Sequence, residues 1–132
     1  MILVADASVL VEYLLRTERS AAVRETIEAP DTDLHIPALC DVEIASALRR
    51  AIALGFLSET RAMEAVDTYL DLALVRYSHE HLLRRILALR RNFSAYDAAY
   101  VALAEELNAP LLTGDRRLAR AAAAHTGISI LE

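Results

Sequence analysis

The chain has 132 residues, 55% of them hydrophobic, so we expect one domain over residues 1–132 that buries a sizeable core without disulfides. Its net charge of −5 argues against a protein that coats nucleic acid, but not against a nuclease, whose metal site needs acidic residues only locally. No apolar run approaches the roughly 20 residues that span a bilayer, and the first residues lack a signal peptide's basic segment, so no membrane contact is expected.

Short apolar runs alternate with amphipathic segments along the chain. We predict strands over residues 2–6, 34–36, 74–77, 111–113 and 128–131. We predict helices over residues 8–16, 18–28, 37–54, 58–72, 78–91, 94–107 and 115–125. The expected N-caps are Ser8, Ser58, Ser78, Ser94 and Asp115. In the helix that Ser58 begins, Met63, Val66 and Leu70 form the expected apolar stripe.

Strands that alternate with helices imply parallel crossover connections. We therefore predict an α/β three-layer sandwich, with a central, mostly parallel sheet of four to five strands and helices on both faces. The single cysteine, Cys40, is expected to be a small buried hydrophobe, and the lack of a disulfide partner fits a cytoplasmic protein. In folds of this kind, ligands bind beyond the carboxyl ends of the strands.

Four acidic residues are predicted to gather at that edge of the sheet. Asp6 and Asp115 follow apolar runs that read as strands, while Glu43 and Asp97 lie within a turn or two of helix starts. Carboxylates that converge repel one another unless a cation is held between them. A cage of hard oxygen ligands suits Mg²⁺ or Mn²⁺, and these ions commonly serve phosphodiester chemistry.

Each acid also has a structural interpretation. Asp97 follows Ser94 at capping-box spacing, and Asp115 suits a helix N-cap. Glu43 could be an ordinary solvent-facing helix residue. Asp6 is the hardest to explain structurally, because an uncompensated carboxylate so near the core is costly.

Four segments together resemble the PIN domain family and, within it, the VapC-type toxins of bacterial toxin–antitoxin pairs. The opening Leu3-Val4-Ala5-Asp6-Ala7-Ser8 resembles the family's hydrophobic strand and Asp-x-Ser start. The stretch from Ile36-Pro37 to Leu48 resembles its glutamate helix. Residues 96–104, with Asp97, and residues 111–115, with Asp115, resemble the segments of the third and fourth acids.

The resemblance implies a PIN-like fold and an endoribonuclease toxin that depends on Mg²⁺ or Mn²⁺. Asp6, Asp97 and Asp115 would hold the metal directly or through water, and Glu43 would complete the shell or orient the attacking water. In-line attack on RNA would leave a 5′-phosphate and a 3′-hydroxyl. The expected partners are an RNA substrate, a small VapB-like antitoxin and a second copy of the chain in a homodimer.

Further site residues follow from the same resemblance. Ser8 and Thr113 are candidates to orient a ligand carboxylate or to bind a phosphate, although Ser8 could equally cap a helix. Arginines are candidate rim contacts for RNA phosphates, or else solvated helix surface: Arg16, Arg49, Arg50, Arg116, Arg117 and Arg120. All 14 of the chain's Lys or Arg residues are arginines, which codon bias would also explain.

Other functions compete with this interpretation. Receiver domains and haloacid-dehalogenase-like phosphatases normally need a site lysine, and this chain has none. A PIN nuclease that matures ribosomal RNA or cuts DNA stays open, as does a non-catalytic PIN module that binds RNA or protein.

Overall fold

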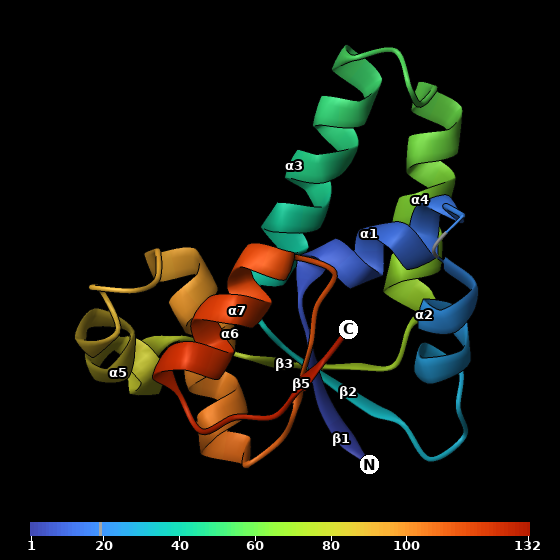
Figure 1. Ribbon diagram of the computed structural model, residues 1–132. Helices are drawn as coiled ribbons and strands as arrows, with labels where there is room; N and C mark the ends of the chain where they lie inside the picture. Colours follow the sequence, from blue (N-terminus) through green and yellow to red (C-terminus); the bar gives the residue numbers. More distant parts are fainter. Residues whose placement is uncertain (19) are drawn as a thin grey trace.

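The fold, seen in a computed structural model that describes residues 1–18 and 20–132, is built on a five-stranded parallel sheet (Figure 1). The strand order is β3-β2-β1-β4-β5, and every pair is parallel. The strands are β1 (Ile2–Ala5), β2 (Asp33–Pro37), β3 (Leu74–Tyr77), β4 (Leu111–Leu112) and β5 (Ile130–Leu131). The predicted α/β architecture is thus confirmed.

Helices cover both faces of the sheet. They are α1 (Ala7–Leu15), α2 (Ser20–Ile27), α3 (Leu39–Ala53), α4 (Glu59–Asp71), η1 (Glu80–Leu82), α5 (Leu83–Ala88), α6 (Ala95–Leu107) and α7 (Arg116–His125). Figure 1 shows α1, α2 and α4 on one side and α5, α6 and α7 on the other, with α3 and α4 rising away from the sheet as a hairpin. Residue 19, inside the predicted helix 18–28, lies outside the described residues. None of the described helices is long and apolar enough to cross a lipid bilayer.

Strand β1 and helix α6 are among the most deeply buried elements of the core. Leu3, Val4 and Ala5 of β1 are fully buried, as expected for a strand with neighbours on both edges and helices on both faces. Every residue of α6 from Ala98 to Ala104 is also buried, and the helix contacts β1, β2 and β4. Mostly small side chains in this stretch let α6 lie close to the sheet.

Several local predictions are confirmed. The side chains of Ser58, Ser94 and Asp115 accept hydrogen bonds from backbone amides in the first turns of α4, α6 and α7. Gly55 and Asn108 take positive φ angles of 78° and 49° after α3 and α6, and these helices end within one residue of their predicted ends.

Three local predictions are wrong. Asp6, not Ser8, is the N-cap of α1, because the Ser8 hydroxyl bonds instead to the Asp6 carboxylate and to the distant Gly114 amide. Ser78 does not begin one long helix, since η1 and α5 divide residues 80–88 between them. On α4, the buried residues are Ala62, Ala65 and Tyr69; of the predicted stripe, Met63 and Leu70 are exposed and Val66 is partly buried against the core. The buried face of α4 is thus built mainly from two small alanines and a tyrosine.

Candidate active site

Asp6 lies at the carboxyl end of β1, next to β4. Its backbone amide donates to the carbonyl of Leu112 at 2.9 Å, which extends the β1–β4 ladder by one bond. The side chain is buried, with 7% of the residue exposed. Burial raises the pKa of Asp6, hydrogen bonds from Ser8 and Thr113 oppose that rise, and the charge of Asp115 adds to it. The sheet therefore fixes a carboxylate at its topological switch point.

Two hydroxyl groups hold the Asp6 carboxylate. The Ser8 hydroxyl donates to Asp6 Oδ2 at 2.7 Å and accepts from the Gly114 amide at 2.9 Å. The Thr113 hydroxyl donates to the same oxygen at 2.8 Å and accepts from the Asp115 amide at 3.0 Å. Each hydroxyl thus links Asp6 to the loop after β4 and orients the carboxylate.

Glu43 lies in the second turn of α3 and is paired with Tyr100 of α6. The Tyr100 phenol donates to Glu43 Oε1 at 2.5 Å. Burial raises the pKa of Glu43, the Tyr100 hydrogen bond opposes that rise, and the charges of Asp6 and Asp97 add to it. Burial also raises the pKa of Tyr100, so the phenol stays the proton donor of the pair.

Asp97 lies in the first turn of α6, where its amide donates to the hydroxyl of Ser94 at 3.1 Å. Burial raises the pKa of Asp97, and the charges of Asp6 and Asp115 raise it further. Arg117 opposes this rise, because its Nη2 lies 3.7 Å from Asp97 Oδ2. The Arg117 side chain is 84% exposed, so water screens the pair and it offsets little of the negative charge.

Asp115 is the N-cap of α7. Its Oδ1 accepts from the amides of Arg117 at 2.9 Å and Leu118 at 3.1 Å. Capping therefore engages one carboxylate oxygen, and a carboxylate offers two oxygens with about four lone-pair positions. A structural role and a ligand role are compatible in this residue.

The four carboxylates form one electrostatic group. Asp115 raises the pKa of Asp6, Asp6 raises that of Glu43, and both raise that of Asp97. Within residues 1–18 and 20–132, however, no three His, Cys, Asp or Glu side chains are placed close enough to hold one metal ion. The acids are thus close enough to repel one another, and shared coordination would require side-chain rotation.

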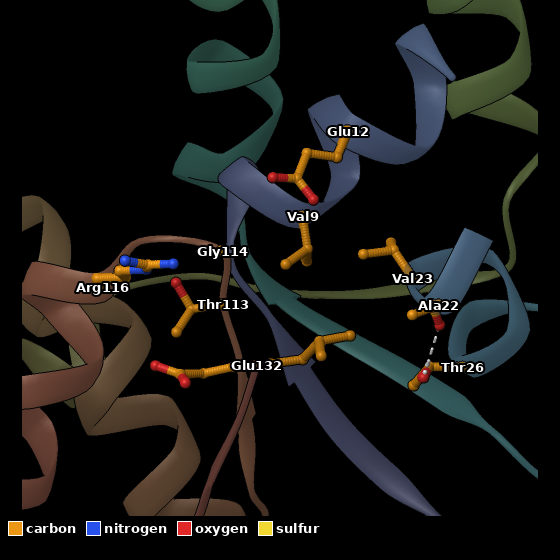
Figure 2. Close-up of a pocket in the computed structure, with 10 residues that line it drawn as sticks. Val9, Glu12, Ala22, Val23, Thr26, Thr113, Gly114, Arg116 and Glu132 are labelled. Carbon is orange, nitrogen blue, oxygen red and sulfur yellow. Dashed lines mark hydrogen bonds between the residues drawn. The ribbon is translucent and has the colours of Figure 1, made fainter. Parts of the chain in front are cut away.

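A pocket of about 310 Å³ adjoins the acids through Thr113 and Gly114, although none of the four acids lines it. Figure 2 shows Arg116 and Glu132 near Thr113 at one end, with Val23 and Thr26 of α2 at the other. Gly114 is tightly placed, because a Cβ there would lie 3.1 Å from Glu12 Oε1. The loop after β4 therefore borders a pocket lined by both polar and apolar side chains.

The other predicted rim arginines are more scattered. Arg16 lines a separate pocket with residues of α2 and α4, and Arg49 and Arg50 are exposed in the second half of α3. Arg120 is exposed on α7. Of the six candidates, Arg116 and Arg117 are therefore the ones at the loop that carries Asp115.

Tyr100 is the site neighbour that the sequence analysis missed. Its signal was weak, because a tyrosine on an apolar helix normally reads as core packing, although it lies three residues after Asp97. Its neighbour Cys40 is fully buried, as predicted. Burial raises the pKa of the Cys40 thiol to about 11, so this is no reactive thiolate.

Comparison with known proteins decides the family. The PIN domain model matches residues 3–124. The chain belongs to the PIN domain family. It is of the VapC type: a VapC ribonuclease of Mycobacterium bovis is 41% identical over 129 residues, covering 98% of each chain.

Solved structures agree with this fold. The crystal structure of a protein from Pyrobaculum aerophilum superposes with a TM-score of 0.71 at 25% identity, covering 98% of this PIN domain and 83% of that chain. VapBC2 from Rickettsia felis, bound to a DNA fragment from its promoter, gives 0.70 at 14% identity, with 99% and 98% covered.

Proposed function

We propose that this PIN domain is an endoribonuclease that depends on Mg²⁺ or Mn²⁺ and acts as the toxin of a VapBC-type pair. The observation that carries the proposal is the electrostatic coupling of Asp6, Glu43, Asp97 and Asp115 at the carboxyl edge of the parallel sheet. The 41% identity to a named VapC ribonuclease supports RNA as the substrate class.

The donor set fits a hard divalent cation in its chemistry. Burial and mutual repulsion raise the pKa values of Asp6, Glu43 and Asp97, so these groups gain from a positive charge among them. Asp6, Asp97 and Asp115 would hold the ion directly or through water, with Glu43 completing the shell or orienting a water. When bound, the ion would lower the pKa of water and offset charge on the reacting phosphate.

The chain's own residues supply orientation and substrate contacts. Ser8 and Thr113 hold Asp6 in place, so their hydroxyls serve the ligand carboxylate rather than an RNA phosphate. Arg116 and Arg117 directly follow Asp115 at the start of α7, where their guanidinium groups can pair with phosphates of the RNA. Cleavage by in-line attack of water would leave a 5′-phosphate and a 3′-hydroxyl.

Two protein partners belong to the proposal. A VapB-like antitoxin is supported by the fold shared with VapBC2 of Rickettsia felis. A basic antitoxin segment would be attracted by the four carboxylates and would compete there with a metal ion. We also propose a homodimer, which sedimentation equilibrium of the purified chain would test.

The decisive experiment is cleavage of total cellular RNA by the purified protein with Mg²⁺ or Mn²⁺, with and without EDTA. Cleavage should require the metal and should stop in Asp97→Asn, while circular dichroism shows an unchanged fold. If Asp97→Asn cut as fast as the parent, the site assignment would be wrong. Failure of the parent to cut any RNA would favour a PIN module that only binds.

A further inference from the structure

We propose that Tyr100 is a positioning residue that fixes the Glu43 carboxylate for metal-assisted cleavage, an inference that rests on the proposed function. Its phenol oxygen lies 2.5 Å from Glu43 Oε1, at the short end of the range for a hydroxyl that donates to a carboxylate. The Tyr100 ring is 1% exposed, so packing leaves the phenol little freedom to point elsewhere. The tyrosine is therefore the rigid partner of this pair, and it sets the orientation of the Glu43 carboxylate.

The contact between Tyr100 and Glu43 joins two different helices. Glu43 belongs to α3 and Tyr100 to α6, 57 residues further along the chain. Asp97 lies one turn before Tyr100 on α6, so one helix carries both a proposed metal ligand and the group that orients another. The bond therefore sets the relative positions of Glu43 and Asp97 across two helices.

The contact also leaves Glu43 able to act. Tyr100 engages Oε1, and a carboxylate can accept further bonds through its second oxygen. Such a hydrogen-bond donor fixes the orientation of the carboxylate and leaves its second oxygen available to a metal ion or a water. Partners of this kind typically contribute about 10- to 100-fold to metal affinity or activity.

A second buried tyrosine provides a matched control. Tyr69 of α4 is 3% exposed, and its phenol donates to Asp41 Oδ1 at 2.7 Å. Asp41 is paired with Arg76 at 2.9 Å and is not one of the four coupled acids. Tyr69, like Tyr100, also contacts Cys40. Tyr69→Phe thus removes the same atom from a second buried tyrosine beside Cys40 and leaves the Tyr100–Glu43 bond in place.

The test compares Tyr100→Phe, Tyr69→Phe, Glu43→Gln and the Tyr100→Phe/Glu43→Gln double variant. We expect Tyr100→Phe to lower kcat on RNA by about 10-fold or more with KM within about twofold, and to weaken Mn²⁺ binding in calorimetry of EDTA-stripped, dialysed protein. In the Glu43→Gln background, the same change should alter kcat by less than about twofold. Tyr69→Phe should leave kcat and Mn²⁺ affinity unchanged.

The outcomes separate the inference from the proposed function. If the parent cleaves RNA and Tyr100→Phe stays within about twofold in kcat and Mn²⁺ affinity, only the positioning role is overturned. Equal losses in both backgrounds would likewise reduce Tyr100 to a general structural residue. A parent that neither cleaves RNA nor binds Mn²⁺ would overturn both.

If Tyr100→Phe does not fold, Glu43→Asp is tested in its place. This change moves the carboxylate back by one methylene, and an unchanged Mn²⁺ affinity would contradict the inference.

Discussion

The Thr113 hydroxyl donates a 2.8 Å hydrogen bond to Asp6 Oδ2 and joins the carboxyl ends of β1 and β4. Thr113 is fully buried, and its oxygen also accepts from the Asp115 amide at 3.0 Å. One side chain thus orients one proposed metal ligand and holds the backbone of another. Thr113 thus connects Asp6 and Asp115 through hydrogen bonds in the protein without a ligand.

Thr113→Val should therefore destabilise the protein and impair the site together. Valine matches the shape of threonine but leaves the buried Asp6 carboxylate and the Asp115 amide each without one partner. We expect a loss of about 1–3 kcal/mol in the free energy of unfolding, measured by urea titration. Thr113→Ser keeps the hydroxyl and loses one methyl group, so it should cost about 1 kcal/mol or less. Equal losses in the two variants would refute the hydrogen-bonding role.

Asp97→Asn should stabilise the metal-free protein at neutral pH while it stops RNA cleavage. The folded pKa of Asp97 is raised, so the native state holds its proton more tightly than the unfolded chain. The contribution of Asp97 to stability is therefore greatest at low pH and is lost as pH rises from about 4 through the raised value. Asparagine removes that penalty, on the order of 1 kcal/mol or less for a partly exposed group.

The measurement for Asp97→Asn is urea unfolding in EDTA at pH 4 and at pH 7.5. The stabilisation should be full at pH 7.5 and clearly smaller at pH 4, close to the ordinary pKa of an aspartate. Asp67→Asn is a matched control, because Asp67 is exposed on α4 and is not one of the four coupled acids. A destabilised Asp97→Asn at pH 7.5 would show that Asp97 has a structural role that outweighs the repulsion.

Divalent-metal affinity should fall as the pH decreases, and the fall should begin at a higher pH than for a site of ordinary carboxylates. The pKa values of Asp6, Glu43 and Asp97 are all raised, and a carboxylate must lose its proton to bind a metal. Protons therefore compete with the ion as pH falls through these raised values. Calorimetric Mn²⁺ titrations between pH 4.5 and 8 would test this, and a flat affinity across that range would count against a site built from these acids.

Much of the fold and the four acids could be predicted from the sequence, because both depend on local patterns. An apolar run followed by an acid places Asp6 and Asp115 at strand ends once the sheet is parallel. The roles of Ser8 and Tyr100 depend instead on partners 106 and 57 residues away. A local rule favoured Ser8 as a helix cap, but its hydroxyl bonds instead to the nearby Asp6 carboxylate and to the distant Gly114 amide. No spacing rule could pair Tyr100 with Glu43.

Helix α3, which carries Glu43, is capped by a residue from a distant part of the sequence, and no local pattern predicts this contact. Its N-cap residue, Ala38, offers no side-chain acceptor, and the Leu39 amide instead donates to Nε2 of His79 at 3.1 Å. We expect His79→Ala to cost about 0.5–2 kcal/mol in the free energy of unfolding and to speed hydrogen exchange at the Leu39 amide. Ser78→Ala is the control, because Ser78 is an exposed neighbour whose hydroxyl donates to Glu80. That variant should stay within about 0.5 kcal/mol of the parent. If the two variants lost equal stability, or if Leu39 exchange did not change in His79→Ala, the imidazole would not be the cap of α3.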